Sequence, residues 1–313
     1  MHEFYKQLKE FGHVRLNEPM SKHTTFKIGG SADFFIEVND NDKMVKLLNC
    51  LNDEGIEYFI LGGGSNLLFS DEGFRGVVIE LRTKNLELRT QDTIVADSGV
   101  LLSQVVGEAL KNGLSGLEWA AGIPGTVGGA VRGNAGAMGK ETAVNLEKVE
   151  VWRDGEILEL KAEECGFSYR GSIFKKNNDV VLRAWFKLKV GDKKEILKKM
   201  QEYLAQRKGK FPTEPNAGSF FQNIHIKKWP GKLEDLPPLF VERKKIPIGW
   251  LVEQVEMKGF TVGGAKISEQ HGNFIVNFNK ATQQDILTIV EVLKEKIYNK
   301  FGVEIESEVE IVP

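Results

Sequence analysis

The sequence has very little cysteine and no excess of either charge. Its two cysteines, Cys50 and Cys165, match neither the ligand spacing of a zinc or iron–sulfur site nor a disulfide framework. We therefore expect no metal site and a reducing compartment. The 42 Lys and Arg residues nearly balance the 44 Asp and Glu residues, for a net charge of −2. Such a balance supplies no long-range field for a nucleic-acid backbone, so no nucleic-acid partner is expected.

Long apolar runs are also lacking near the amino terminus. The first 20 residues mix charges with aromatics, without the apolar core of a signal peptide or the length of a membrane helix. We expect a cytoplasmic protein without membrane insertion. A chain of 313 residues is longer than one hydrophobic core usually serves. We expect a helical segment at 1–20, one domain at 21–190 and a second at 191–313.

Helical and strand periodicities alternate along the chain. Phe4, Leu8 and Phe11 predict a short amphipathic helix over 3–11. We next expect strands at 34–38, 58–61 and 77–81 around a helix containing Met44, Val45, Leu47 and Leu48, and then a strand at 93–97, a helix at about 102–111 and strands near 147–151, 156–160 and 180–188. A basic helix with an apolar stripe of Ile196, Leu197, Met200 and Leu204 should follow. The last expected helices lie near 249–257 and 282–300.

Two glycine-rich loops follow apolar segments. The first, LGGGSNLL, is neither a Walker A loop nor a Rossmann turn, and alone it is equally well explained as a tight turn. The second, GIPGTVGGAVRGNAGAMG, places seven glycines between Gly122 and Gly139. Because bare backbone amides bind phosphate oxygens without charged side chains, the pair favours a bound diphosphate such as that of a dinucleotide.

An ordered set of motifs spans nearly the whole chain. It consists of HTTFKIGGSADFF, LGGGSNLL, GLEWAAGIPGTVGGAVRGNAGAMG, FSYRGSIF, AGSFFQN, GWLVEQVEMKGFTVGGAKIS and ESEVEIV. In this order the motifs resemble the UDP-N-acetylenolpyruvoylglucosamine reductase (MurB) family, flavoenzymes that complete UDP-N-acetylmuramate for bacterial peptidoglycan. The resemblance implies an α+β fold, with an FAD-binding domain of the PCMH or vanillyl-alcohol-oxidase type followed by a smaller α+β substrate-binding domain.

The resemblance also assigns the two glycine loops to the FAD pyrophosphate. In some relatives of this flavin fold, a histidine or cysteine in these loops bonds the flavin covalently. Neither residue occurs between Ile60 and Leu68 or between Gly122 and Gly139, so FAD is expected to bind without a covalent bond. NADPH is the implied co-substrate. The implied cofactor-binding residues are Gly62, Gly63, Gly64, Ser65, Asn66, Gly122, Ile123, Pro124, Gly125, Thr126, Gly128, Gly129, Asn134 and Gly136.

Three residues match the family's catalytic positions. Arg170 would stabilise the negative charge that hydride transfer creates on the substrate carboxylate, and Ser219 would deliver a proton to the neighbouring carbon. Glu308 would help to position or protonate the intermediate. The period of two in VEIESEVEIV, however, places Val303, Ile305, Ser307, Val309 and Ile311 on one face of a strand, with the four glutamates on a solvent-facing side, and does not distinguish Glu308 from its neighbours.

Further contacts follow from the resemblance. Tyr169, Asn223 and Gln254 match substrate-binding positions. Arg207, Lys208 or Lys210 is a candidate for a contact with the diphosphate of the substrate or NADPH, with a solvated helix face as the alternative. His271 is expected to pack or to bond the backbone rather than to act in catalysis.

The sequence departs from the family pattern beside the proposed substrate. Gln222 and Ile224 stand where the family commonly has lysine and proline, and Ser307 replaces a proline before Glu308. The segment from 224 to 248 is longer than usual, which suits either a lid or an elaborated loop.

Two other functions are compatible with the loops. One is a flavin oxidoreductase of the same fold with another substrate, which would leave AGSFF and ESEV unexplained. The other is a non-catalytic protein that binds sugar nucleotides, against which the complete set of Arg170, Ser219 and Glu308 argues. The preferred assignment is a monomeric enzyme whose partners are a sugar nucleotide and NADPH.

Overall fold

The computed structural model describes residues 2–313 and divides into two compact units. Unit 1 comprises residues up to 18 together with 32–63 and 75–208, and unit 2 comprises 19–31, 64–74 and 209–313. Both units are therefore built from three separate stretches of chain. The functional boundaries expected at residues 20 and 190 stay predictions, because the compact units change at other positions.

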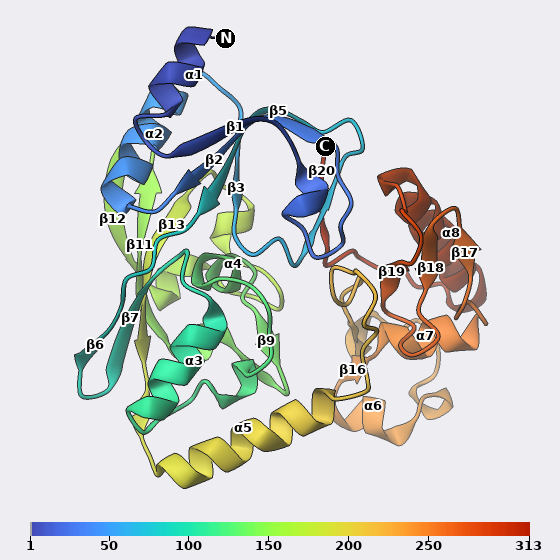
Figure 1. Ribbon diagram of the computed structural model, residues 1–313. Coiled ribbons are helices and arrows are strands. Elements are labelled where there is room, and N and C mark those ends of the chain that lie inside the picture. Colours follow the sequence, from blue (N-terminus) through green and yellow to red (C-terminus); the bar gives the residue numbers. More distant parts are fainter. Residues whose placement is uncertain (1) are drawn as a thin grey trace. The chain divides into compact units, whose positions relative to one another are not determined.

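The amino-terminal part of unit 1 is a four-stranded sheet with a helix packed on it (Figure 1). Its core forms from the buried face of α2, namely Met44, Leu47, Leu48 and Leu51, against strand residues such as Val77 and Ile79. The order is β1 (His13–Pro19), β2 (Ser31–Val38), β5 (Phe74–Leu81) and β3 (Tyr58–Leu61), with β3 parallel to β5, and the helices are α1 (His2–Leu8) and α2 (Asn41–Asp53).

A five-stranded antiparallel sheet forms the rest of unit 1. Two helices pack their apolar faces on it and enclose a second core that includes Trp119, Val149 and Phe186. The strand order is β12 (Glu156–Lys161), β11 (Leu146–Arg153), β13 (Val180–Lys187), β7 (Thr93–Asp97) and β6 (Leu86–Thr90); the helices are α3 (Leu102–Lys111) and α4 (Val127–Arg132); and two short ladders join β8 (Leu114–Ser115) to β14 (Lys189–Val190) and β9 (Gly136–Ala137) to β10 (Lys140–Glu141).

The long helix α5 (Lys193–Arg207) completes unit 1. It contacts α3 and the short 3-10 helix η2 (Glu118–Ala120). Its expected apolar stripe is only partly used, because Ile196 is buried and Met200 joins the core while Leu197 and Leu204 remain 43% and 44% exposed. Most of this basic helix therefore faces solvent.

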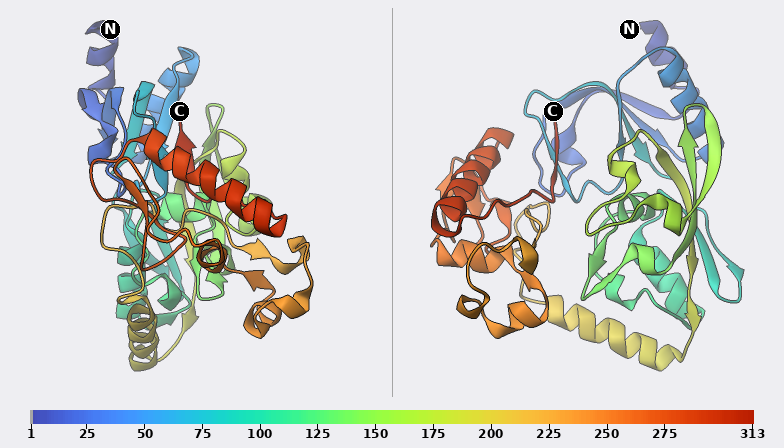
Figure 2. Two further views of the ribbon diagram at one scale, coloured as in Figure 1. Left: turned by 90° about the vertical axis from the view of Figure 1, so that its right-hand side faces the viewer. Right: turned by 180° about the vertical axis from the view of Figure 1, so that it is seen from behind.

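In unit 2, the helix α8 (Gln283–Phe301) packs on a three-stranded sheet, and the views of Figure 2 show it as the long red helix. Phe26, Ile28 and Leu68 from the early part of the chain enter the same core. The other elements are β17 (Thr261–Val262), β18 (Ala265–Ile267), β19 (Ile275–Asn277), α6 (Pro238–Glu242), α7 (Ile248–Gln254), the antiparallel pair β15 (Ile224–His225) and β16 (Lys245–Ile246), and the parallel pair β4 (Leu67–Phe69) and β20 (Glu310–Val312).

Further 3-10 turns connect these elements. They are η1 (Met20–Lys22), η3 (Thr142–Val144), η4 (Ala162–Cys165), η5 (Ile173–Lys175), η6 (Ile226–Lys228) and η7 (Leu233–Asp235). Among the described residues, no helix is long and apolar enough to cross a membrane.

The local predictions from periodicity are confirmed for β7 and α3 at the expected bounds, and for α2, α7 and α8 within a few residues. The carboxyl-terminal strand is a correction. Only Glu310–Val312 forms a strand, and Ile311, expected inside, is 43% exposed while Val312 is buried. The alternation shifts by one residue after Val309 because β20 pairs with β4.

Candidate active site

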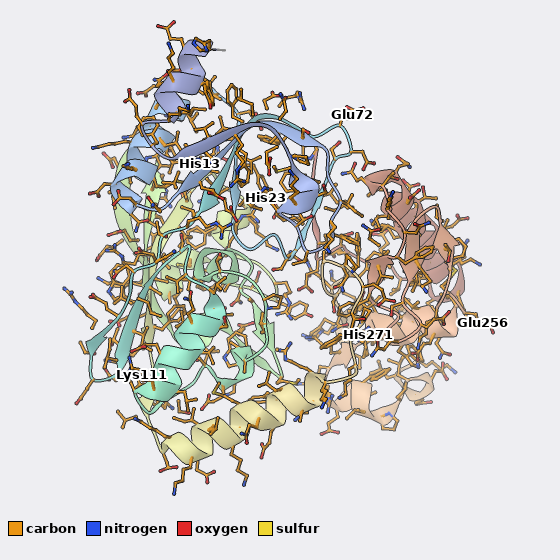
Figure 3. The ribbon with its side chains drawn as sticks, in the orientation of Figure 1. His13, His23, Glu72, Lys111, Glu256 and His271 are labelled. Carbon is orange, nitrogen blue, oxygen red and sulfur yellow. The ribbon has the colours of Figure 1, made fainter. Side chains whose placement is uncertain are left out.

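The two glycine loops lie directly against each other within unit 1. A Cβ atom at Gly62 would lie 2.6 Å from Thr126 Oγ1, and one at Gly63 would lie 2.9 Å from the Cα of Gly125. Real side chains do not tolerate such contacts, so these positions require glycine. The first loop passes from unit 1 to unit 2 after Gly63, and Gly64 takes a left-handed φ of 60° beside the carbonyl of His23, a residue labelled in Figure 3.

Both loops carry backbone amides that are available to a ligand. Within residues 2–313, the amides of Gly63, Gly64 and Ser65 donate to no protein acceptor, although Gly64 is buried. In the second loop, the amides of Gly125 and Thr126 are likewise uncommitted. Because buried amides are nearly always hydrogen-bonded, this arrangement fits a group rich in acceptor oxygens, such as a pyrophosphate.

Not every predicted loop residue contributes a donor. The Ile123 amide donates to Ala120 O at 3.0 Å, and the Gly128 amide donates to Ser98 O at 2.9 Å. Thr126 begins α4 and accepts from Gly129 N at 3.4 Å. Ile123 and Gly128 therefore shape the loop, while the amides without an acceptor among residues 2–313 are the candidates for anion binding.

Arg207 lies beside the second loop at the end of α5. A Cβ at Gly122 would approach the Cδ of Arg207 to 3.6 Å. The Nε of Arg207 is buried without a hydrogen-bond partner in residues 2–313, and burial lowers the pKa of the guanidinium. A desolvated cation beside bare amides suits a phosphate, so the structure favours Arg207 over Lys208 and Lys210, both of which are exposed.

Arg170 lies in unit 1 on a tight turn closed by a bridge between Ser168 and Gly171. Its φ is 59°, a left-handed conformation uncommon for a residue with a side chain. Its Nη2 donates to Gly136 O at 2.6 Å, and its Cζ lies 5.2 Å from the centre of the Tyr169 ring. Arg170 is thereby attached to the second glycine loop and to a predicted substrate residue.

Asn134 holds the same turn through hydrogen bonds of its side chain. Its side chain is fully buried, with Nδ2 donating to Ser168 O at 2.9 Å and Oδ1 accepting from Ala143 N at 3.1 Å. The side chain that the resemblance assigns to the cofactor therefore also fixes the Arg170 turn.

Ser219 and Glu308 lie on two neighbouring extended segments of unit 2, joined by an isolated bridge between Phe221 and Ser307. The Glu308 amide donates at 2.8 Å to the carbonyl of Phe220, the residue after Ser219. Ser219 is half-buried, and its hydroxyl makes no hydrogen bond with residues 2–313. The hydroxyl is thus free to face a substrate.

The fold separates Glu308 from two of the adjacent glutamates, which the alternating pattern did not. Glu304 and Glu306 are exposed, whereas Glu308 and Glu310 are both half-buried. Asn66 Nδ2 donates to Glu308 O at 3.0 Å, and the Glu310 amide donates to Asn66 O at 3.0 Å. Asn66 in the first glycine loop therefore holds the backbone at Glu308, a contact between residues 242 positions apart that no local signal reveals.

Asn223 and Gln254 lie at opposite ends of α7. Asn223 Oδ1 accepts from Ile248 N at 3.1 Å and so caps the start of the helix, and the exposed Gln254 ends it. His271, labelled in Figure 3, packs on Phe274 with ring centres 4.9 Å apart and accepts from Asn273 N at 3.2 Å. Burial lowers the pKa of His271. Its surroundings are those of a packed, backbone-bonded histidine.

The segment from 224 to 248 leaves and re-enters the core through one short ladder. Ile224 pairs with Ile246, and the excursion between them contains η6, η7 and α6. Trp229 from this segment packs on Trp250 and Phe301. Its ring centre lies 6.5 Å from that of Trp250 and 5.5 Å from that of Phe301. The segment is a folded elaboration anchored by aromatic side chains.

A pocket of about 560 Å³ lies elsewhere in unit 2. It includes Lys27, Lys280 and Phe278, and the carboxylate of Asp71 in its wall accepts from Gln283 N at 2.9 Å. None of the predicted site residues lines this pocket. The glycine loops and the Ser219 and Glu308 segments are therefore described apart from this pocket, each within its own unit.

The chain matches two family models in sequence. Residues 32–161 match an FAD binding domain, and residues 210–312 match the C-terminal domain of UDP-N-acetylenolpyruvoylglucosamine reductase. The UDP-N-acetylenolpyruvoylglucosamine reductase of Caldanaerobacter subterraneus subsp. tengcongensis is 41% identical over 309 residues, covering 98% of this chain and 96% of that protein. The same-named protein of Bacillus pumilus is 41% identical over 307 residues, covering 97% and 95%.

A solved structure agrees with these matches. The crystal structure of UDP-N-acetylenolpyruvylglucosamine reductase (MurB) from Thermus caldophilus has a TM-score of 0.79 and 35% identity, covering 97% of this chain and all of that one. The glycine cradle and the matched domains define an FAD-dependent oxidoreductase of α+β fold. More narrowly, the chain belongs to the UDP-N-acetylenolpyruvoylglucosamine reductase family.

Proposed function

We propose that Arg170, Ser219 and Glu308 act on the substrate in the reaction of this family. The chain is an FAD-dependent UDP-N-acetylmuramate dehydrogenase that uses NADPH to reduce the enolpyruvyl ether of UDP-N-acetylglucosamine to UDP-N-acetylmuramate, a peptidoglycan precursor. FAD, bound at the glycine loops, supplies the hydride. What the three residues must supply is charge stabilisation and a proton.

Arg170 stabilises the anion. Hydride addition to the enolpyruvyl double bond places negative charge on the carboxylate side of the substrate, and a guanidinium offers a planar pair of donors that matches a carboxylate. Its bond to Gly136 and its ring contact with Tyr169 hold the guanidinium in place before the substrate arrives. Tyr169 then contacts the same substrate.

Ser219 donates the proton, and Glu308 supports the donor or the intermediate. The observation that supports this assignment is the bond from the Glu308 amide to Phe220 O, which joins the backbone next to Ser219 to the backbone of Glu308. A hydroxyl without a hydrogen-bond partner among residues 2–313 is a suitable proton donor when a nearby positive charge stabilises the alkoxide or a neighbouring group resupplies the proton. Asn223, beside the start of α7, and Gln254, at its end, contact the sugar nucleotide.

The remaining predicted residues hold FAD without a covalent bond. Amides of Gly63, Gly64, Ser65, Gly125 and Thr126 would bind the pyrophosphate, and Arg207 would meet the diphosphate of the substrate or of NADPH. Gly62, Gly122 and Gly129 keep the loops free of side chains, Pro124 fixes one backbone angle, and Ile123, Asn66, Gly128, Asn134 and Gly136 fix the loop shape.

The two half-reactions test the assignment separately. In Ser219→Ala, flavin bleaching by NADPH should proceed at a nearly normal rate. Reoxidation by the enolpyruvyl sugar nucleotide should slow by about a hundredfold, the usual cost of removing a catalytic proton donor. Anaerobic stopped-flow absorbance measures both rates. Equal losses in the two halves would reject the proton-donor role.

We further propose that the enzyme is a cytoplasmic monomer. The near-neutral charge and the absence of cysteine pairing support this location, because a reduced chain needs no oxidising compartment. Light scattering during size-exclusion chromatography should give the mass of one chain; a dimer mass at micromolar concentration would contradict it.

A further inference from the structure

The backbone beside Ser219 is held from one side by the strand that carries Glu308. Phe221 lies opposite Ser307, the Glu308 amide donates to Phe220 O at 2.8 Å, and the Gln222 amide donates to Glu306 O at 2.9 Å. In an antiparallel pair of this kind, the residue between the bonded positions directs its own N–H and C=O away from the partner strand. Phe221 therefore presents a donor and an acceptor on the opposite side.

Asn273 fills that opposite side. Its Oδ1 accepts from Phe221 N at 3.0 Å, its Nδ2 donates to Phe221 O at 2.8 Å, and its carbonyl accepts from Phe220 N at 2.8 Å. The side chain is only 3% exposed. One asparagine thus takes the place of a neighbouring strand, and Ser219 begins a segment fixed on both sides.

We propose that Asn273 is a positioning residue that sets the location of Ser219 relative to Glu308. The proposal rests on the proton-donor role of Ser219 given above. Three hydrogen bonds from one residue to Phe220 and Phe221 leave the adjoining backbone little freedom. Displacement of a reacting group by about 1 Å typically costs about a hundredfold in rate, so a side chain that does not touch the substrate controls proton delivery.

The variant Asn273→Asp tests the role with almost no change of shape. The carboxylate still accepts from Phe221 N but no longer donates to Phe221 O, so two oxygens face each other and Phe221 must move. Substrate-dependent flavin reoxidation should slow by about 10- to 100-fold. Flavin reduction by NADPH should change by less than about twofold, because the proton donor has no part in that half.

Asn277→Asp is the matched control. Asn277 is also a buried asparagine that bonds backbone groups in the same region, with Nδ2 donating to Phe26 O at 3.1 Å and Oδ1 accepting from Ala281 N at 2.8 Å. Its backbone amide donates to Pro215 O at 2.9 Å, but its side chain has no hydrogen bond to residues 219–222. A general loss of stability would affect both variants alike, whereas a positioning role affects only Asn273→Asp.

Rates are expressed per flavin-loaded chain, so unfolded protein does not affect the measured rates. Thermal unfolding of all variants is measured alongside. Should Asn273→Asp not bind flavin, Asn273→Ser is judged by the same criterion. Reoxidation by Asn273→Asp within twofold of Asn277→Asp, while Ser219→Ala is slow, would overturn the positioning role alone. A normal rate in Ser219→Ala would reject the role of Ser219, and the positioning role with it.

Discussion

At the scale of single residues, Gly63 lies where a methyl group has no room. Its Cβ would approach the Cα of Gly125 in the facing loop, which cannot yield as a flexible side chain would. In Gly63→Ala we expect the two loops to separate and the affinity for FAD to fall at least tenfold, since the amides no longer converge on the pyrophosphate. Fluorescence titration of the flavin-free protein with FAD measures the change.

Gly107→Ala is the control for that experiment. Gly107 is an exposed position inside α3, where an added Cβ meets nothing within 4 Å. Its FAD affinity should equal that of the unchanged protein. A similar loss of affinity in both variants would show that the glycine contact is not the cause.

His271 gives a pH dependence with a defined sign. Burial lowers its pKa in the folded protein, so the unfolded chain binds a proton more readily than the folded one. Its contribution to stability is complete above the unfolded pKa of about 6.5 and is lost as pH falls toward the lower folded value. The free energy of unfolding should therefore decrease more between pH 7.5 and 5.5 in the unchanged protein than in His271→Gln. Urea denaturation at both pH values tests this, and equal decreases would contradict it.

Prediction from sequence fails at the residue scale where the decisive contact is distant. The motifs indicated Arg170, Ser219 and Glu308, but alternation described Glu308 as one of four equivalent glutamates. Its half-buried position depends on Phe220 and Asn66, which approach it only after the chain has folded. Asn273 gave no signal at all, because its role is to bond backbone groups 52 residues away.

At the scale of elements, α8 begins against a residue from another part of the chain. Asp71 Oδ1 accepts from Gln283 N at 2.9 Å and Oδ2 from Gln284 N at 3.3 Å, next to the N-cap Thr282. A carboxylate at the start of a helix accepts hydrogen bonds from the free amides there. Its negative charge also interacts favourably with the positive end of the helix dipole. Asp71→Ala should lower the free energy of unfolding by about 1 kcal/mol, as measured by urea denaturation. A change in the free energy of unfolding below about 0.3 kcal/mol would show that Thr282 alone is enough to cap the start of α8.

A substitution inside the helix α3 should stabilise the folded protein. Because Gly107 is in the interior of α3 with open space around it, Gly107→Ala should raise the free energy of unfolding by about 0.5 to 1 kcal/mol through the lower entropy of the unfolded chain. Differential scanning calorimetry measures the shift. A lower midpoint would indicate that the position is constrained by its neighbours after all.

Elements were predictable where periodicity and burial agree. In α2 and α3 every buried residue lies on one helical stripe, so the sequence pattern and the structure coincide. In α5 two leucines of the predicted stripe remain exposed, although Ile196 is buried and Met200 packs on the core. In the last strand, pairing with β4 overrode the alternation.

At the scale of the whole molecule, the order of the chain does not follow the division into units. Composition suggested a change near residue 190, where the basic helix begins. The structure assigns α5 to unit 1 through its contacts with α3 and η2, and assigns 19–31 and 64–74 to unit 2. The family models at 32–161 and 210–312 cover continuous stretches, so neither reveals these insertions. Long-range pairing is invisible to local patterns.

This interleaving predicts that the carboxyl-terminal region does not fold alone. A fragment of residues 209–313 lacks Phe26, Ile28 and Leu68 from its core, lacks β4 as the partner of β20, and loses the Asp71 cap on α8. Each missing large apolar side chain costs about 2 to 5 kcal/mol, so the sum of the three approaches the entire stability of a domain. Circular dichroism of the fragment should show no cooperative thermal transition. A chain in which 19–31 and 64–74 are fused to 209–313 by flexible linkers should regain one, and a cooperative transition in the plain fragment would contradict the division into units.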